Sequence, residues 1–385
     1  MRSFQPQPVL IDDYTHTMSA AQTQRTVKIG EKLAEKTRQL VNHVTGFVVA
    51  IDLDPTFTTA PTIVELSKAL ANLIFKADSG RVAVNLSGPD LRAMEAYENG
   101  GKLVVPDADL TSGSTNNFYA TRYVNFAPLG YAGGDDDFAL PVALLGEATL
   151  DLTYPAFTDV SADGTAGTVR VRIFAMCVGL NRVNIPPKFD LRSFAAAGNA
   201  VELGERSLIT HALLCDSAAH AAITAGDFAN LSFRDREGDF LSAVPAAVLT
   251  SMYWAQNRTG QLGIIQGEPQ AATDDNLKIV NGASPTAVVG ASAAYQPVLW
   301  SAQGARIGQN AIETPGRLSW TGTQATGHLL VRRILPRSAE EAKEAAERAF
   351  RRCGIPFKGI GIRTLDRRPY VGDAAEYMPW DGRFR

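Results

Sequence analysis

The stretch Glu147-Ala148-Thr149-Leu150-Asp151-Leu152-Thr153-Tyr154 alternates polar and apolar side chains at almost every step. A second stretch, Thr168–Cys177, alternates in the same way, with valine, isoleucine and alanine on one side and two arginines on the other. A period of two with one apolar face is typical of an antiparallel sheet that buries one side only. These two stretches therefore predict half-buried β-strands.

Short apolar runs bounded by turn-forming residues recur along both halves of the chain. In the first half a β-branched run covers Phe47–Ile51. Further candidate strands are Ser207–Leu214, Asn230–Arg234, Leu262–Gln266, Leu277–Val280, Val298–Ser301, Arg317–Thr321 and His328–Leu335. Many short strands separated by loops favour a sandwich or a jelly roll over alternating strands and helices.

Helical patterns are few. Short helices are predicted over Pro89–Tyr97 and Val244–Ala255. The strongest prediction covers Ala339–Cys353, where Ser338 and Glu341 form a capping box and Gly354 follows as the stop. The stretch Ser19–Val41 predicts a modest basic helix in an N-terminal arm, either solvated or partner-bound, or lying near lipid. Residues 355–385 are expected to be extended, and from Arg351 onward the chain carries eight Lys or Arg and four Asp or Glu.

The two halves of the sequence match at a constant offset of 158 residues. Each set runs from a strand through a charged turn and a second strand to a helix. Chance similarity between β-rich segments stays open as the alternative to duplication. The matched pairs are Phe75 and Phe233, Gly80 and Gly238, Leu91 and Leu249, Met94 and Met252, and Asn99 and Asn257.

Composition suits a two-domain globular protein. The 385 residues are 45% hydrophobic and 20% charged, with a net charge of −3, which argues against a globally basic nucleic-acid binder. Three distant cysteines predict neither a disulfide framework nor a zinc module. The sequence also predicts no secretory signal and no membrane-spanning stretch.

The search for catalytic chemistry predicts no catalytic, cofactor-binding or metal-binding residues. None of the five histidines (His16, His43, His211, His220 and His328) has zinc-protease spacing, and no nucleophile elbow or phosphate-binding glycine loop occurs. The run Asp135-Asp136-Asp137 lacks calcium-loop spacing and is predicted to be a solvated turn. The chain is therefore not expected to be an enzyme. Paired carboxylates and tryptophans that stack on sugars leave a carbohydrate-binding or carbohydrate-active sandwich open. The tryptophans are Trp254, Trp300, Trp320 and Trp380.

One segment carries a resemblance. The stretch Asp135–Leu145, with Ala139-Leu140-Pro141 at its centre, and the strand after it resemble the corresponding part of double jelly-roll major capsid proteins. These proteins form the shells of tailless, membrane-containing bacteriophages and of large eukaryotic DNA viruses. The resemblance implies a mainly β protein of two tandem jelly rolls, each an eight-stranded antiparallel sandwich, with short inserted helices and a C-terminal helix. The expected divisions are an arm over 1–40, jelly rolls over 41–185 and 186–336, and a helix with an extended basic tail over 337–385.

The same resemblance implies a virion shell protein assembled in the host cytoplasm. Its expected partner is itself, as pseudo-hexagonal homotrimers that tile an icosahedral facet against neighbouring trimers. Penton or minor capsid proteins and the lipid of an internal membrane are further expected partners, and sequence-specific nucleic acid is not. Another virion component, such as a penton or spike protein, remains an alternative.

Overall fold

The computed structural model describes most of both halves of the chain and parts of the C-terminal region. The described residues are 6–18, 21–36, 42–57, 65, 67–77, 80–91, 94, 118–127, 138–162, 164–180, 186, 188–203, 208–216, 229–234, 239–245, 263–264, 298–301, 312–313, 317–322, 327–335, 339–352, 360–364 and 375–379.

The first half folds into a two-sheet sandwich. Its first sheet has the strand order β1-β9-β3-β6, and its second has the order β2-β8-β4-β5. Successive strands therefore alternate between the two sheets, except that β4 and β5 are neighbours in one sheet, which is the Greek-key order of a jelly roll. The strands are β1 (Gln7–Thr17), β2 (Thr23–Lys28), β3 (Asn42–Phe57), β4 (Asn72–Lys76), β5 (Val82–Leu86), β6 (Phe118–Asn125), β8 (Thr149–Tyr154) and β9 (Gly164–Gly179).

The second half repeats this strand order. One sheet runs β10-β19-β12-β16, and the other runs β11-β18-β13-β14. We call the two units the first and second barrel. The strands of the second barrel are β10 (Lys188–Ala195), β11 (Ala200–Glu202), β12 (Leu208–Asp216), β13 (Asn230–Arg234), β14 (Asp239–Pro245), β16 (Val298–Ser301), β18 (Arg317–Thr321) and β19 (Gly327–Leu335), with two-residue strands β15 (Gly263–Ile264) and β17 (Ile312–Glu313) beside them. The predicted fold of two tandem jelly rolls is confirmed.

The sequence repeat falls on equivalent strands. Phe75 lies on β4 and Phe233 lies on β13, and each of these is the fourth strand of its barrel. After β4, Gly80 turns the chain toward β5 with a φ of 74°, which glycine adopts without steric cost. The offset of 158 residues therefore aligns the fourth and fifth strands of the first barrel with the fourth and fifth strands of the second.

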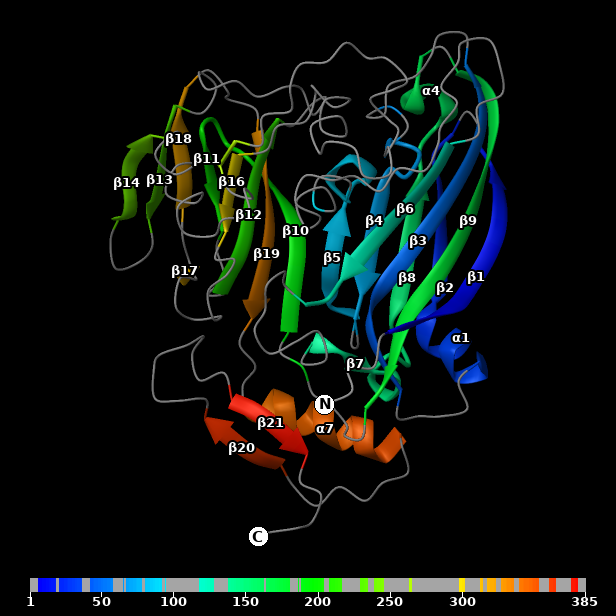
Figure 1. Cartoon of the computed structure of the whole chain (residues 1–385), viewed down its shortest axis with the longest axis vertical. Coiled ribbons are helices and arrows are strands. Elements are labelled where there is room, and N and C mark those ends of the chain that lie inside the picture. Colours follow the sequence, from blue (N-terminus) through cyan, green and yellow to red (C-terminus); the bar gives the residue numbers. More distant parts are fainter. Residues whose placement is uncertain are drawn as a thin grey trace, which may run out of the picture.

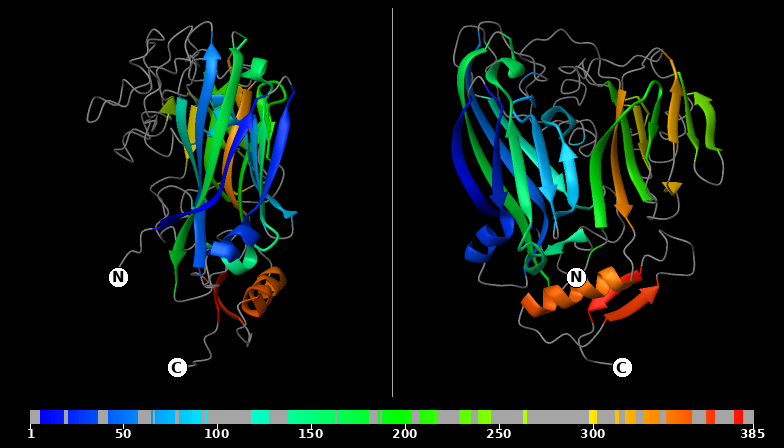
Figure 2. Two further views of the ribbon diagram at one scale, coloured as in Figure 1. Left: turned by 90° about the vertical axis from the view of Figure 1, so that its right-hand side faces the viewer. Right: turned by 180° about the vertical axis from the view of Figure 1, so that it is seen from behind.

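The barrels stand side by side and share a sheet (Figure 1). Strand β10 pairs in parallel with β5, with Leu191 beside Val84 and Arg192 beside Asn85. Leu191 lies on the face of the shared sheet that is covered by the first barrel's other sheet, β1-β9-β3-β6. Strand β11 of the second barrel lies on the opposite face. Viewed from behind, the two barrels keep this side-by-side arrangement (Figure 2).

A polar and aromatic clasp closes the outer side of the first barrel between β1 and β2. The Tyr14 and Tyr154 hydroxyls are hydrogen-bonded to each other, and the Arg25 guanidinium lies 3.7 Å from the centre of the Tyr14 ring. Arg25 also donates to Asp12 Oδ2 at 2.9 Å, and His16 stacks on Tyr154. Burial raises the pKa of Tyr14 to about 12 and also raises the pKa of Tyr154, whereas burial lowers the pKa of His16.

A base of short elements lies beneath both barrels (Figure 1). It contains α1 (Ile29–Lys36), the two-residue strand β7 (Leu140–Pro141), the 3-10 helix η3 (Val142–Leu144), α7 (Ala339–Arg352) and the hairpin of β20 (Ile360–Thr364) and β21 (Ala375–Pro379). The small helix α4 (Phe157–Val160) lies at the other end of the first barrel. Helix α7 packs on η3, and its residues Ala345, Ala346 and Ala349 are buried. The predicted C-terminal helix is confirmed.

The N-terminal arm was predicted wrongly. Strand β1 pairs with β9 along its whole length, and β2 pairs with β8, so these residues complete both sheets of the first barrel. Of the described residues within the predicted helix Ser19–Val41, only Ile29–Lys36 are helical. The strand forms instead because Thr23 and Val27 point inward beside Tyr154 and Leu150, and sheet pairing outweighs helix propensity.

The other local predictions have different outcomes. Val244 and Pro245 belong to β14, so the helix predicted from Val244 does not begin there, and the rest of that segment lies outside the described residues. Leu140 and Pro141, at the centre of the segment that carries the resemblance, form β7, pair with β3 and lead through η3 to β8. The predicted strand Leu277–Val280 lies outside the described residues. In the described part of the chain, no helix combines the length and apolar character needed to cross a membrane.

Candidate functional site: the junction between the barrels

An aromatic stack crosses from one barrel to the other. Phe189, on β10 of the second barrel, stacks on Phe126 of the first barrel with ring centres 4.8 Å apart. Phe126 in turn stacks on Phe75 at 5.4 Å and meets Phe47 edge-on at 5.4 Å. Leu191 and Leu330 join the same hydrophobic cluster. The second barrel therefore supplies side chains to the core of the first.

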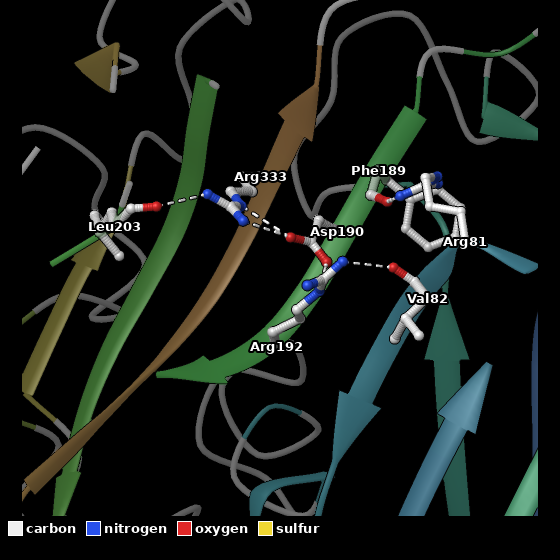
Figure 3. Close-up of polar contacts among 7 residues, drawn as sticks. All are labelled: Arg81, Val82, Phe189, Asp190, Arg192, Leu203 and Arg333. Atoms are coloured by element: carbon white, nitrogen blue, oxygen red, sulfur yellow. Dashed lines mark hydrogen bonds and ion pairs between the residues drawn. The ribbon is translucent and has the colours of Figure 1, made fainter. Parts of the chain in front are cut away.

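A buried carboxylate lies at the centre of the junction (Figure 3). Asp190 on β10 is 0% exposed and lies directly opposite Arg333 of β19. Arg333 donates to Asp190 Oδ2 from Nε at 2.9 Å and from Nη2 at 2.8 Å. Arg192 donates from Nε to the other carboxylate oxygen at 2.5 Å. Because an unpaired buried charge is costly, this arrangement requires all three side chains together.

The two arginines also reach beyond Asp190 (Figure 3). Arg333 donates to the Leu203 carbonyl at 3.0 Å, next to β11 in the opposite sheet of the second barrel. Arg192 donates to the Val82 carbonyl at 2.8 Å, on β5 of the first barrel. Arg81 of the first barrel donates back to the Phe189 carbonyl at 3.0 Å. Through its two arginines, the carboxylate thus connects the first barrel with both sheets of the second barrel by charge-assisted hydrogen bonds.

The opposite face of β19 holds a second set of polar contacts. Arg332 is 1% exposed, and its Nη1 lies 2.7 Å from the Asn125 carbonyl and within 3.4 Å of the carbonyls of Phe126 and Ala127. His328 Nε2 lies 2.6 Å from Asp90 Oδ1, and both side chains are buried. Asp90 belongs to the short helical segment 88–91 of the first barrel. Neighbouring arginines of one strand therefore anchor both barrels.

Together these contacts make the junction a fastening between two barrels. Buried hydrogen-bonded charges tolerate little displacement, because any movement that separates the partners leaves an unpaired charge in the low-dielectric interior of the protein. The packed phenylalanines add an apolar contact with fixed geometry. The arrangement can hold the second barrel in one orientation on the first. In the described residues, no three His, Cys, Asp or Glu side chains lie close enough together to hold a metal ion.

The structure places the residues singled out in the sequence at scattered positions. His16 lies in the clasp and His43 in the first barrel, while His211 lies on β12. Trp320 is 4% exposed, so its ring faces the core and is closed to a sugar. Cys177 is buried, which raises the pKa of its thiol to about 11. His220, the run Asp135–Asp137, Trp254 and Trp380 lie outside the described residues.

Sequence reasoning missed the junction. His328 opens the predicted strand His328–Leu335, and nothing in the sequence indicated its contact with Asp90, which is 238 residues away. The available signal was Arg332-Arg333 inside an otherwise apolar strand. Two adjacent arginines point to opposite faces of a strand, so neither face could be uniformly apolar.

Comparisons with known proteins give likenesses of fold. No family model matches the sequence, and no curated protein matches it. A chain in the atomic structure of Sulfolobus Turreted Icosahedral Virus is 10% identical with a TM-score of 0.49, over 89% of this chain and 98% of that one. A chain of the PBCV-1 virus capsid is 10% identical with a TM-score of 0.49, over 87% and 96%. The major capsid protein of Bacteriophage PM2 is 10% identical with a TM-score of 0.44, over 86% and 100%. The jelly-roll assignment rests on the strand order alone.

Proposed function

We propose that this chain is a major capsid protein that self-assembles without catalysis. The observation that carries the proposal is the pairing of two jelly rolls of equal strand order, fastened by the Asp190 cluster and the Phe189 stack. A chain of two similar barrels in fixed orientation is a building block with two nearly equivalent sides. The resemblance of the segment Asp135–Leu145 to coat proteins supports the same function.

The proposed assembly is a trimer. Three copies of a two-barrel block place six barrels around one axis, which gives a pseudo-hexagonal outline that can tile an icosahedral facet. Within a trimer, permanent contacts of this kind bury about 2,000 Å² or more. Contacts between trimers, and with penton or minor capsid proteins, are expected to be smaller and more polar. The chain would then act in the virion shell after assembly in the host cytoplasm.

We further propose that the base with α7 faces the inside of the shell, over an internal membrane. Lys and Arg near an anionic lipid surface contribute about 1 kcal/mol each. The sequence from Arg351 onward has the required excess of basic residues. Flotation with anionic vesicles tests this part separately. Binding that disappears when residues 351–385 are removed supports it, and full binding by the truncated chain contradicts it.

Negative-stain imaging of the purified full-length chain tests the proposed function. The expected particles have a pseudo-hexagonal outline and a mass of about 124 kDa, three times 41.3 kDa. Single two-barrel particles at all concentrations, together with measurable sugar binding, would overturn the proposal in favour of a carbohydrate-binding sandwich.

A further inference from the structure

The first barrel has an open side between two edge strands. Strand β1 is the edge of one sheet and β2 is the edge of the other, and within the described residues each pairs with one strand only. Both strands lie on the side of the first barrel that faces away from the second barrel (Figure 1). Because they belong to different sheets, the clasp joins them through side chains and not through a backbone ladder.

Alternate side chains of β1 point into this open side, opposite buried apolar residues of β9. They are Asp12, Tyr14 and His16. Polar side chains that point into a barrel need partners there, since a buried polar group without a hydrogen bond is costly. Asp12 is bonded to Arg25, and Tyr14 to Tyr154. The partners of His16 complete the row.

His16 contacts both of the other strands that form the clasp. Its ring stacks on Tyr154 of β8, with the ring centres 4.8 Å apart and the planes inclined by 24°. Its Nε2 lies 2.9 Å from the hydroxyl oxygen of Thr23, at the start of β2. One imidazole therefore ties β1 to the edge of the opposite sheet and to the strand next to that edge.

The charges of the clasp are already paired with each other. Asp12 Oδ2 lies 2.9 Å from Arg25 Nη2, and the Arg25 guanidinium covers the Tyr14 ring. The described residues that face His16 are uncharged, and they are Tyr14 on its own strand, Thr23 on β2, Tyr154 on β8 and Val169 on β9. Asp12 is thus engaged with Arg25 and does not serve His16.

The other charged side chains of the surrounding elements pair away from the clasp or are exposed. Asp13 pairs with Arg170 at 2.8 Å on the outward face of β1 and β9. Asp151 of β8 pairs with Lys76 at 2.6 Å on the outward face of the other sheet. The remaining ones are Arg172, which lies opposite Asp13, Lys28, which pairs with Glu31, and the exposed Asp159 of α4. Among the described residues, a positive charge on His16 would therefore have no counter-charge of its own.

The neutral imidazole is the favoured form of His16 in the folded chain. The Tyr154 ring can attract a cation, but burial outweighs this attraction and lowers the pKa of His16. Folding therefore favours the unprotonated ring. The contribution of His16 to stability is complete above pH 6.5, the ordinary pKa of histidine, and is lost as the pH falls below that value.

A break in β1 limits the part of the strand that can open. The register shifts between Leu10 and Asp12, and Ile11 at the break is 2% exposed. Met18, directly after the strand, is also buried, and its N–H donates to the Gly167 carbonyl at 3.2 Å. The segment 12–17 thus lies between two anchors, and its inward contacts are those of the clasp.

We propose that His16 is an acid-sensitive latch, which holds the segment 12–17 on the barrel while it is neutral and loosens this segment when it is protonated. Protonation adds an unpaired charge to the clasp and places N–H donors on both ring nitrogens, so Nε2 can no longer accept a hydrogen bond from Thr23. The segment then loses its ties to the opposite sheet, while Ile11 and Met18 keep both ends in place. The inference goes beyond the proposed function and does not rest on it, because it concerns the single folded chain.

Hydrogen exchange of the full-length chain, followed by mass spectrometry and corrected for intrinsic rates, tests the latch at about pH 7.5 and about pH 5. We expect the amides of residues 13–17 to exchange at least about fivefold faster at the lower pH. The amides of β3 in the same sample should keep their rates, because the opening is local.

Two variants assign the acid response. His16→Gln keeps a polar side chain near Thr23 but does not titrate, so it should abolish the response. The matched control Asp13→Asn removes a charge from the outward face of the same strand. The Arg170 guanidinium holds the pKa of Asp13 below its ordinary value, so Asp13 stays ionised in this range and its loss should leave the response unchanged.

The outcomes decide the proposal in each case. An equal acid response in the wild type and in folded His16→Gln overturns it, and so does equal acceleration in β3, which would mean that the whole barrel opens. Where His16→Gln does not fold, the wild type alone decides. A midpoint between about pH 4.5 and 6.5 supports the latch, whereas a lower midpoint belongs to carboxylates and overturns it. His43 lies opposite Val178, at the other end of β9, so its protonation would loosen other amides.

Discussion

Asp190 and Arg333 face each other across the antiparallel pair β10 and β19, and two guanidinium nitrogens of Arg333 lie within 2.9 Å of one Asp190 oxygen. Both side chains are almost completely buried. The pair lies where the barrels meet, so its geometry is tied to their relative orientation. Losing one partner of such a buried pair lowers the stability of the fold more than replacing both partners by apolar residues does.

Removing one partner should therefore destabilise the chain strongly. We expect Arg333→Met to lower the free energy of unfolding by about 3–5 kcal/mol, because Asp190 is left as a buried charge without its main partner. The free energy of unfolding should fall clearly less in the double variant Asp190→Leu/Arg333→Met. Urea unfolding measures both. The control Arg317→Met removes an exposed arginine near Glu202 and should change stability by no more than about 0.5 kcal/mol. Equal losses in the single and double variants would contradict the assigned role.

The aromatic stack across the junction predicts that the barrels unfold together. Phe189→Ala removes a ring packed on Phe126, which typically costs about 3–5 kcal/mol. Because the ring belongs to one barrel and its neighbours to the other, the wild type should show one cooperative transition by calorimetry and by fluorescence. The variant should show two. A wild type that already unfolds in two separate steps would show that the barrels are independent.

The tyrosine clasp predicts loss of stability at alkaline pH. The pKa of Tyr14 is raised from 10.0 to about 12, because burial disfavours the tyrosinate. Folding therefore favours the protonated form, and this contribution is complete below pH 10 and is lost as the pH rises through about 12. Urea unfolding at increasing pH should show this decline, and Tyr14→Phe should flatten it. The same slope in wild type and variant would exclude Tyr14 as its source.

Cys177 should be inert in the folded chain. Its thiol is buried, and its pKa is raised to about 11, so little thiolate is present near neutral pH. In a Cys215→Ser/Cys353→Ser variant, a thiol reagent should react only as fast as the chain opens, and at once in urea. Rapid modification of the native chain would show that β9 is accessible at this point.

Much of the fold could be predicted from the sequence, because local sequence patterns specify several of its strands and its C-terminal helix. The alternation over Thr168–Cys177 identified β9, and the capping box at Ser338 identified α7. The predicted range Asn230–Arg234 coincides with β13. In each case the pattern and the tertiary packing favour the same element.

The N-terminal strands could not be predicted in this way. In β1 only Ile11 is fully buried, and the strand is held by pairing with β9, about 160 residues away. The junction was hidden for the same reason. Asp190 and Arg333 are 143 residues apart, and their pairing depends on register, which a single sequence does not reveal.

The central claim is that the buried junction holds the two barrels in one orientation. Pulsed electron–electron double resonance measures the distance between spin labels at Thr168→Cys on the first barrel and Arg234→Cys on the second, in a chain without its native cysteines. This distance reports directly on the relative orientation of the barrels. The wild-type junction should give one narrow distance distribution. Arg332→Met, which removes the donor to the carbonyls of residues 125–127, should broaden it. A broad distribution with the junction intact would contradict the account.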